Sequence, residues 1–462
     1  MAETNKIAGV ISGLPKFIRQ GLRNRMIKDA GHLAGSQYVA TGLSFFTTLA
    51  AARILGSATY GIAAMVTAYP VLLWSFAAVK SVSVTTRYIA GFRATGQSEQ
   101  IRSICKLGYG LDLLVSVIAF LLVSATASWV ASSIMGLPEN TWLMVVYAAS
   151  FPFYSLIGTS TAIFSAWEKF RWLAVFQVLD KGMTLIAVIG LLSFGYGVSA
   201  VVLGTAVGNI ITGLAMVGGA TYTLYLEGIG PWWKSGLSRV LPMRKELSAF
   251  FGWNYVLITL TGFVGQLPLI VLGHLRGPEE AGFYRLATTL VATGSFLEFA
   301  LGRVVYPVLS VRWGEGERDA LISLIRRWTF GWGFPLGLLI LVTIPLLPVF
   351  VPLFLGHAYR PMVFGTQLMM LGAAVSAVFF WLTAFYYASG QFGFFTKAYA
   401  FYTLFVIGLA WYGARNWGFS GLAGIITVGR ALFVLLMVST ASRVEAQSFN
   451  VEKQVVGNSV KI

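Results

Sequence analysis

Gly56-Ser-Ala-Thr-Tyr-Gly61 and Gly277-Pro-Glu-Glu-Ala-Gly282 are two glycine-bounded connections between long apolar segments, and they lie 221 residues apart. The same spacing relates Gly197-Val-Ser199 to Gly418-Phe-Ser420. A spacing of 220 relates residues at a third connection: Gly96, Ser103 and Lys106 correspond to Gly316, Ser323 and Arg326. Because these matches fall at equivalent connections, the sequence predicts two homologous lobes in tandem.

The composition indicates a chain that lies mostly in lipid. Of its 462 residues, 57% are hydrophobic and 11% are charged, against roughly 25% charged in a soluble domain. A helix of about 20 mainly apolar residues crosses a bilayer, and twelve segments qualify: 33–55, 62–85, 107–131, 141–166, 172–194, 198–224, 248–273, 284–311, 327–350, 362–388, 395–415 and 419–441. The predicted fold class is an all-α polytopic membrane protein with about twelve transmembrane helices in two six-helix lobes around a central cavity.

The distribution of Lys and Arg predicts the orientation. The net charge is +16, and cytoplasmic loops of membrane proteins are enriched in these residues, which favours a membrane protein over a nucleic-acid binder. With the N-terminus inside, the inner segments carry 24 Lys and Arg, and the outer loops carry five, namely Arg53, Arg276, Arg285, Arg360 and Arg415. Both termini are therefore expected in the cytoplasm.

The predicted organisation has five parts: a basic cytoplasmic segment 1–32, an N-lobe 33–225, a cytoplasmic linker 226–247, a C-lobe 248–441 and a cytoplasmic tail 442–462. The stretch from Lys6 to Lys28 fits either an amphipathic helix on the inner leaflet or a disordered basic tail. Gly204-xxx-Gly208 and Gly333-xxx-Gly337 predict close helix packing. Six helices per lobe give a parallel repeat, in which substrate sits between lobes that rock around it.

Seven ionisable residues lie inside the expected spans, where burial costs at least about 2.5–3.5 kcal/mol and usually serves a function. Four are basic and are the candidate substrate-binding residues of an electropositive cavity: Lys80, Lys181, Arg303 and Arg430. Three are acidic and are candidates for binding a coupling ion or proton: Glu298, Asp180 and Asp112. Asp180 and Lys181 point about 100° apart on a helix and need not pair. The alternative is that these charges form structural ion pairs or extend to the membrane surface.

Several chemical motifs are missing from the sequence. There is no G-x-x-x-x-G-K-[ST] phosphate loop for ATP and no G-x-S-x-G nucleophile motif. His32, His274 and His357 have no metal-ligand spacing, and the single cysteine, Cys105, allows no intramolecular disulfide. No secretory signal peptide is evident. We therefore expect no cofactor, no metal and no enzymatic activity.

Five stretches resemble a known family. They are Arg53-Ile-Leu-Gly-Ser-Ala-Thr-Tyr-Gly61, Arg87-Tyr-Ile-Ala90, Lys169-Phe-Arg-Trp-Leu-Ala174, Gly277-Pro-Glu-Glu-Ala-Gly-Phe-Tyr284 and Gly418-Phe-Ser-Gly421. In order and spacing they are similar to the O-antigen and exopolysaccharide flippases of the multidrug/oligosaccharidyl-lipid/polysaccharide exporter superfamily, over nearly the whole chain. One departure is Ser57-Ala-Thr59, where the family often has proline and an acid.

The resemblance implies a flippase that moves an undecaprenyl-pyrophosphate-linked oligosaccharide across the bacterial cytoplasmic (inner) membrane by alternating access, for O-antigen (lipopolysaccharide), capsule or exopolysaccharide synthesis. The implied partners are that lipid-linked sugar, membrane lipids, and polymerase and chain-length proteins of the same pathway, with no nucleic acid. Two alternatives stay open. One is a cation-coupled drug or cation antiporter of the same fold, and the other is a membrane polysaccharide polymerase.

Overall fold

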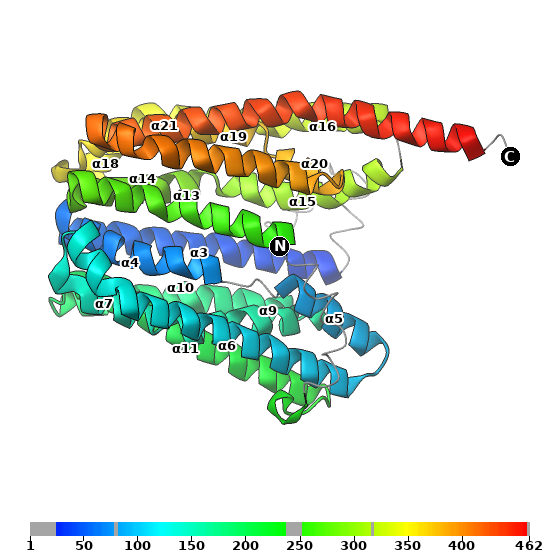
Figure 1. Cartoon of the computed structure of the whole chain (residues 1–462), viewed down its shortest axis with the longest axis horizontal. Helices are drawn as coiled ribbons and strands as arrows, with labels where there is room; N and C mark the ends of the chain where they lie inside the picture. Colours follow the sequence, from blue (N-terminus) through cyan, green and yellow to red (C-terminus); the bar gives the residue numbers. More distant parts are fainter. Residues whose placement is uncertain (1–24, 78–81, 237–251, 316–317, 460–462) are drawn as a thin grey trace, which may run out of the picture.

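The computed structural model describes residues 25–77, 82–236, 252–315 and 318–459, and over these residues the chain is helical without strands. The first lobe, here the N-lobe, contains α3 (Arg25–Leu55), α4 (Ser57–Ala77), α5 (Val82–Ala94), α6 (Ser98–Trp129), α7 (Thr141–Ala148), α8 (Phe151–Ser155), α9 (Ile157–Ala166), α10 (Phe170–Ser193) and α11 (Val198–Leu226). The second, the C-lobe, contains α13 (Gly252–Arg276), α14 (Pro278–Gly294), α15 (Phe296–Gly314), α16 (Arg318–Trp328), α17 (Phe334–Thr343), α18 (Leu347–Leu355), α19 (Met362–Val378), α20 (Leu382–Ala388) and α21 (Phe392–Ser459). The long helices run side by side in Figure 1.

The helices agree with the expected number of spans. Nine stretches of the described chain are long and apolar enough to cross a membrane, and the bent pair α19 and α20, which meet at 43°, makes a tenth. The stretch 392–441 contains two spans, because its backbone turns at Gly418. The predicted eighth span corresponds to α14 and α15, which follow one another across Ser295 and are not among these ten. The structure thus confirms an all-α polytopic fold with about twelve spans.

Some predicted boundaries were wrong, and for the eighth span the difference follows from the way its helix begins. The eighth span was expected to begin at residue 284, but α14 begins at Pro278, directly after Gly277 with its φ of +89°. Proline suits the first helical turn because its missing N–H has no partner there. The third span, expected from residue 107, begins at Ser98 in α6. The N-terminal stretch Lys6–Lys28 lies almost entirely outside the described residues.

The backbone repeats the sequence symmetry. Gly197, which precedes α11, has φ 54° and ψ −129°. Gly418, 221 residues later, has φ 58° and ψ −143° and divides α21 into an antiparallel pair of helices. A side chain disfavours positive φ, so glycine is the residue that fits both turns. The last two helices of each lobe are therefore joined by the same turn.

Buried hydrophobic residues form three clusters, and their arrangement shows where the lobes meet. The largest cluster joins the two lobes and includes Ala52, Val66, Leu269, Leu286 and Tyr359. The other two each belong to one lobe: one holds Ile101, Phe164 and Leu224, and the other holds Leu309, Phe385 and Met437. The described parts of the lobes thus share a core toward one end and have separate cores toward the other.

We call the joined end, around residues 52–61, 277–282 and 353–359, the closed end; it lies at the left of Figure 1. The opposite end, around residues 95–97, 167–169 and 389–391, is the open end. Polar contacts cross between lobes at the closed end. Arg53 donates to the carbonyl oxygens of Leu353 and Phe354 at 2.9 and 2.7 Å, and the Tyr359 hydroxyl donates to the Ala52 carbonyl at 2.7 Å. These hydrogen bonds hold the two lobes together at the closed end.

Small residues bring helices together where the sequence predicts it. A Cβ on Gly208 would lie 2.2 Å from the Thr184 hydroxyl oxygen, and one on Gly204 would lie 2.6 Å from a methyl of Val188. A Cβ on Gly333 would lie 2.1 Å from the Val378 carbonyl oxygen. The predicted close packing at both G-xxx-G pairs is confirmed, because only hydrogen fits at these positions.

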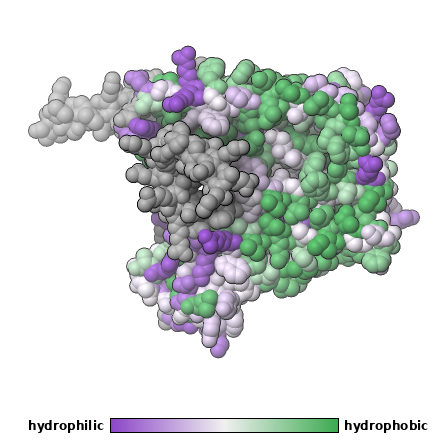
Figure 2. Space-filling view, turned by 180° about the vertical axis from the view of Figure 1, so that it is seen from behind, coloured by the Kyte–Doolittle hydropathy of each residue, from purple (hydrophilic) through white to green (hydrophobic). Residues whose placement is uncertain are grey.

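The outer surface carries large apolar side chains. Phe46, Leu121, Phe334 and Leu404 are 60%, 56%, 57% and 69% exposed. Figure 2 shows a broad hydrophobic surface, with hydrophilic residues gathered toward its ends. An apolar surface of this extent would be costly in water and matches a lipid environment. The structure is that of a multi-pass membrane protein.

Candidate functional site

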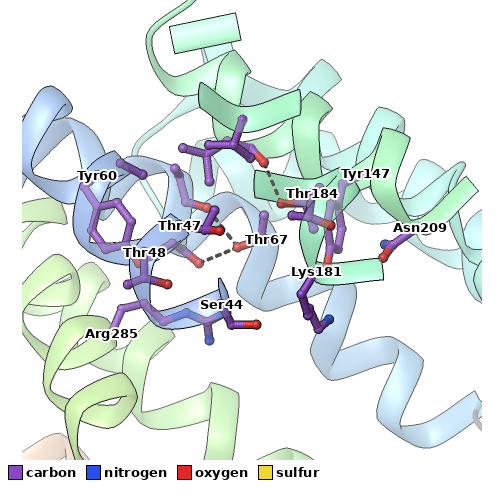
Figure 3. A pocket seen from close by; sticks show the side chains of 16 residues that line it. Ser44, Thr47, Thr48, Tyr60, Thr67, Tyr147, Lys181, Thr184, Asn209 and Arg285 are labelled. Atoms are coloured by element: carbon purple, nitrogen blue, oxygen red, sulfur yellow. Dashed lines mark hydrogen bonds between the residues drawn. The ribbon is translucent and has the colours of Figure 1, made fainter. Parts of the chain in front are cut away.

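A cavity of about 230 Å³ lies within the N-lobe and reaches the boundary with the C-lobe. Side chains from α3, α4, α7, α10 and α11 surround it, and one residue of α14 completes its wall (Figure 3). Its polar lining consists of Ser44, Thr47, Thr48, Tyr60, Thr67, Tyr147, Lys181, Thr184, Thr205, Asn209 and Arg285. Two cations among many hydroxyls make this cavity basic and strongly polar.

The hydroxyls present oxygen atoms to the cavity. Thr47, Thr184 and Thr205 each donate to the carbonyl four residues earlier in the same helix, at 2.8, 2.8 and 2.7 Å. Thr67 does the same toward Ala63 at 2.9 Å. Such bonds occupy the hydroxyl hydrogen and leave the oxygen lone pairs available. The cavity wall can therefore accept hydrogen bonds from the hydroxyls of a ligand.

Lys181, one of the four candidate substrate-binding residues, stands near the middle of α10 and lines this cavity. Its ammonium group forms an ion pair with Asp180 at 2.7 Å, although adjacency on the helix did not require it. Asp180 also accepts a hydrogen bond from the Thr212 hydroxyl at 3.4 Å. The Lys181 side chain is 38% exposed and that of Asp180 is 13% exposed. Lys181 thus presents its charge to the open space while Asp180 balances it from the wall.

Arg285 is the residue that the sequence analysis missed. It was counted with the outer loops, whereas α14 begins seven residues before it and carries it into the membrane region. Its guanidinium lies beside the Tyr60 hydroxyl and within electrostatic reach of Tyr147. In Figure 3 it enters from a helix of the C-lobe. Its position three residues after Gly282, directly following the repeated connection, was the signal that could have identified it.

The other predicted cations lie elsewhere. Lys80 falls outside the described residues, and Arg303 belongs to α15 in the C-lobe. Arg430 is in the second half of α21, where its guanidinium lies beside the Tyr402 hydroxyl and within electrostatic reach of Glu298. Arg430 and Glu298 therefore form a second polar cluster, in the C-lobe. The structure brings Lys181 together with Arg285 and Arg430 together with Glu298.

The two clusters are related by the repeat. A spacing of 221 residues places Arg430 at the position of Asn209 and Tyr402 at that of Lys181. Asn209 lines the N-lobe cavity together with Lys181. Each lobe thus carries polar side chains of its cluster on its last two spanning helices, and Glu298 joins the C-lobe cluster from α15.

Asp112 stands apart from both clusters. It is buried on α6 and accepts hydrogen bonds from the Thr159 hydroxyl at 2.6 Å and from the Thr159 backbone N–H at 3.2 Å. Thr159 is in the first turn of α9, where free N–H groups and the helix dipole favour a negative charge. Asp112 therefore caps a neighbouring helix.

The fold and the cavity define a multi-pass membrane protein of two helical lobes with a basic cavity at their boundary. The sequence profile of the family described as "Polysaccharide biosynthesis protein" matches residues 26–313. The chain belongs to this family, as the resemblance in the sequence indicated.

A curated relative is "Inner membrane protein YghQ" of Escherichia coli (strain K12), 21% identical over 292 residues, which are 63% of this chain and 82% of the relative. Two solved structures share the fold at 14% identity. One is a multidrug resistance MATE family transporter of the MOP superfamily in an inward-facing conformation, with a TM-score of 0.74 over 88% of this chain and 95% of that one. The other is the lipid II flippase MurJ in an inward closed conformation, with a TM-score of 0.70 over 89% and 87%.

Proposed function

We propose that this protein is a flippase that moves an undecaprenyl-pyrophosphate-linked oligosaccharide from the inner to the outer leaflet of the bacterial cytoplasmic membrane. The proposal rests on one observation: Lys181 of the N-lobe and Arg285 of the C-lobe line the same cavity. An arginine can grip a phosphate with two hydrogen bonds, and a second cation suits a doubly charged pyrophosphate. The hydroxyl oxygens of the same cavity suit the sugar next to it.

The membrane orientation follows from the charges. With both termini in the cytoplasm, the open end faces the cytoplasm and the closed end faces outward. A head group would then enter from the inner leaflet into the space where the lobes have separate cores. Its lipid tail would stay in the bilayer. Rocking of the lobes would close the inner side and open the end now locked by Arg53 and Tyr359.

Glu298 and Asp180 are proposed as the acids that couple transport to a cation or proton, whereas Asp112, predicted together with them, is proposed to act as a helix cap. Of these, Glu298 lies near Arg430 and Asp180 pairs with Lys181, so each is a counter-ion that an anionic substrate would displace. A displaced carboxylate in a membrane is costly unless it binds a cation or proton. This exchange offers a physical link between substrate and coupling ion.

The family description and the name of the relative support the pathway and the location. A polysaccharide biosynthesis protein that transports lipid-linked sugars would serve O-antigen, capsule or exopolysaccharide synthesis. Polymerase and chain-length proteins of the same pathway are then its proposed partners. The name "Inner membrane protein YghQ" fits the proposed membrane.

The test is flipping of a pyrophosphate-linked oligosaccharide lipid by the purified protein in proteoliposomes. Arg285→Gln and Lys181→Gln should each lower the flipping rate roughly ten- to a hundredfold, as expected for losing charged hydrogen bonds of about 1.5–3 kcal/mol. Arg415→Gln, at an exposed C-lobe arginine, is the matched control and should keep the native rate. Equal rates in all four proteins would refute the proposed role of this cavity.

A second candidate is a drug or cation antiporter of the same fold. The acids Asp180 and Glu298 inside the helices favour it, because a cationic substrate needs an acidic site. Proteoliposomes that export organic cations and ignore pyrophosphate-linked lipids with several sugar heads would support this candidate. The cations Lys181 and Arg285 would then be structural.

A further inference from the structure

A stripe of exposed side chains on α16 and the turn after it forms a shallow basic hollow of about 480 Å³ near the open end. We call it the α16 face, and it consists of Asp319, Ile322, Ser323, Arg326, Arg327 and Phe330. The opposite side of α16 is apolar: Leu321 is buried in the C-lobe core, and Ile325 and Trp328 pack against that core. The helix is therefore fixed in place, with its basic face outward.

The repeat shows what the equivalent face does in the N-lobe. Ser103 and Lys106, the counterparts of Ser323 and Arg326, both bind the segment that follows α11. The Ser103 hydroxyl contacts the Ser235 hydroxyl at 2.8 Å and donates to the Gly236 carbonyl at 2.9 Å. The Lys106 ammonium donates to the Ser235 carbonyl at 2.8 Å. In the N-lobe this pair of donors is thus occupied by oxygen atoms.

An aromatic side chain of the same segment packs on the N-lobe face beside those oxygen atoms. Trp232, in the same segment after α11, lies on the ring of Tyr109 with 4.5 Å between centroids. The occupant of the N-lobe face therefore supplies oxygen acceptors for a hydroxyl and a cation, and an apolar body beside them. The C-lobe face has the same donors, with Phe330 as its aromatic residue.

The C-lobe donors have no such occupant within the described chain. Arg326 and Arg327 are exposed, and neither forms an ion pair with a residue that the structure describes. The Ser323 hydroxyl donates to its own helix, at the Ala320 carbonyl, 2.9 Å away. Among the described residues these two arginines have no ion-pair partner, and Asp319 offsets only one of their two charges, so the face favours an anionic ligand.

The position of the face identifies the ligand. Immediately after the two arginines, Phe330, Trp332 and Phe334 point outward and are 66%, 61% and 57% exposed. Exposed aromatic residues next to Lys or Arg mark the level where lipid head groups meet the hydrocarbon. The arginines therefore stand at head-group height, and the apolar residues below them stand at acyl-chain height.

We propose that the α16 face binds the phosphate of an anionic phospholipid of the inner leaflet. Arg326 and Arg327 contact the phosphate, the Ser323 oxygen accepts from the head group, and the acyl chains lie along Phe330 and Trp332. This site is distinct from the Lys181–Arg285 cavity and does not depend on what that cavity transports. The lipid would hold the base of the ninth span in place, as the segment after α11 does for α6.

The test uses the full chain, purified in detergent, with added phosphatidylglycerol or with phosphatidylcholine of the same acyl chains. Phosphatidylglycerol should raise the melting temperature of the native protein, because a ligand of the folded state stabilises it. The variant Arg326→Gln/Arg327→Gln should bind phosphatidylglycerol roughly thirtyfold more weakly, as loss of two surface charges implies. Arg312→Gln, at the same end, is the control and should respond as the native protein does.

Two outcomes would overturn the proposal. One is an equal response of the double variant to phosphatidylglycerol, or an equal effect of phosphatidylcholine on the native protein. The other comes from a photo-crosslinker on Ser323→Cys, which reacts selectively because Cys105 is buried. A lipid adduct supports the proposal, whereas a crosslink to residues 442–462 shows that the chain's own tail covers this face. A variant that folds poorly is recognised by a low melting temperature without added lipid.

Discussion

The Cα atom of Gly61 lies 3.2 Å from the point where a Cβ on Gly282 would stand. In return, a Cβ on Gly61 would stand 1.7 Å from the carbonyl oxygen of Pro278, and a Cβ on Gly282 would stand 2.6 Å from that of Ser57. Both pairs, Gly61 with Gly282 and Ser57 with Pro278, are 221 residues apart. Gly61 thus faces Pro278, and Gly282 faces Ser57, which is the repeat counterpart of Pro278. This reciprocal arrangement is the geometry of a twofold contact.

This crossing of α4 and α14 is a close backbone contact between the two lobes at the closed end. One hydrogen bond beside it also joins the lobes, from the Ser57 hydroxyl to the Glu279 carboxylate at 2.8 Å. Backbones can approach this closely only where both residues lack a side chain. The closed end therefore depends on two glycines.

Gly61→Ala should weaken the closed end. Alanine usually favours a helix over glycine by about 1 kcal/mol, but here its methyl would overlap the Pro278 carbonyl, and overpacking costs about 1–3 kcal/mol or more. We expect a lower melting temperature and greater reactivity of a thiol introduced at Thr48 in the cavity. The measurement is maleimide labelling, since Cys105 is buried. Gly110→Ala on α6, which meets no atom within 4 Å, should be neutral or stabilising, and a matching loss there would count against the explanation.

Asp180→Asn should strengthen anion binding in the N-lobe cavity. Asp180 neutralises Lys181 at 2.7 Å, so an incoming pyrophosphate must displace it. A partly exposed ion pair contributes up to about 1 kcal/mol, which predicts up to roughly fivefold tighter binding of inorganic pyrophosphate by isothermal titration calorimetry. Lys181→Gln should weaken the same binding. Weaker binding in Asp180→Asn would instead mean that the carboxylate orients Lys181 for the ligand.

Asp112→Asn separates a structural role from a coupling role. The amide side chain of this variant would keep an oxygen that accepts from Thr159, so transport should continue at near the native rate with a small loss of stability. Asp112→Ala should lower stability by about 1 kcal/mol, the usual cost of a lost helix cap. The measurements are thermal melting and flipping in proteoliposomes. Complete loss of ion-driven transport in Asp112→Asn would restore the predicted coupling role.

Glu280→Ala should loosen the hairpin of α21. The Glu280 carboxylate accepts the backbone N–H of Phe419 at 2.6 Å and so caps the helix that begins after Gly418. Removing this cap should destabilise the protein by about 1 kcal/mol, seen as a lower melting temperature. Glu315→Ala, at an exposed acid of the open end, is the control. The cap is unimportant if both substitutions have the same effect.

Local sequence properties determined the architecture. Hydropathy located the spans because each helix must satisfy its own backbone in lipid and must be apolar on most of its surface. The 221-residue spacing predicted the two lobes, since repeated connections such as Gly197-Val-Ser199 and Gly418-Phe-Ser420 require the same backbone conformation. Lys181 was chosen as a candidate because a charge within a span is costly wherever the helix packs.

Only the tertiary structure decided which charges share a site. Arg285 lines the same cavity as Lys181 because α14 packs against the N-lobe. Arg430 lies near Glu298 because the α21 hairpin folds back beside the C-lobe helices. Asp112 proved to cap α9, a contact between residues 47 positions apart. Hydropathy is a property of one segment, whereas a site between helices depends on their rotation and crossing, which side-chain packing across the whole molecule sets.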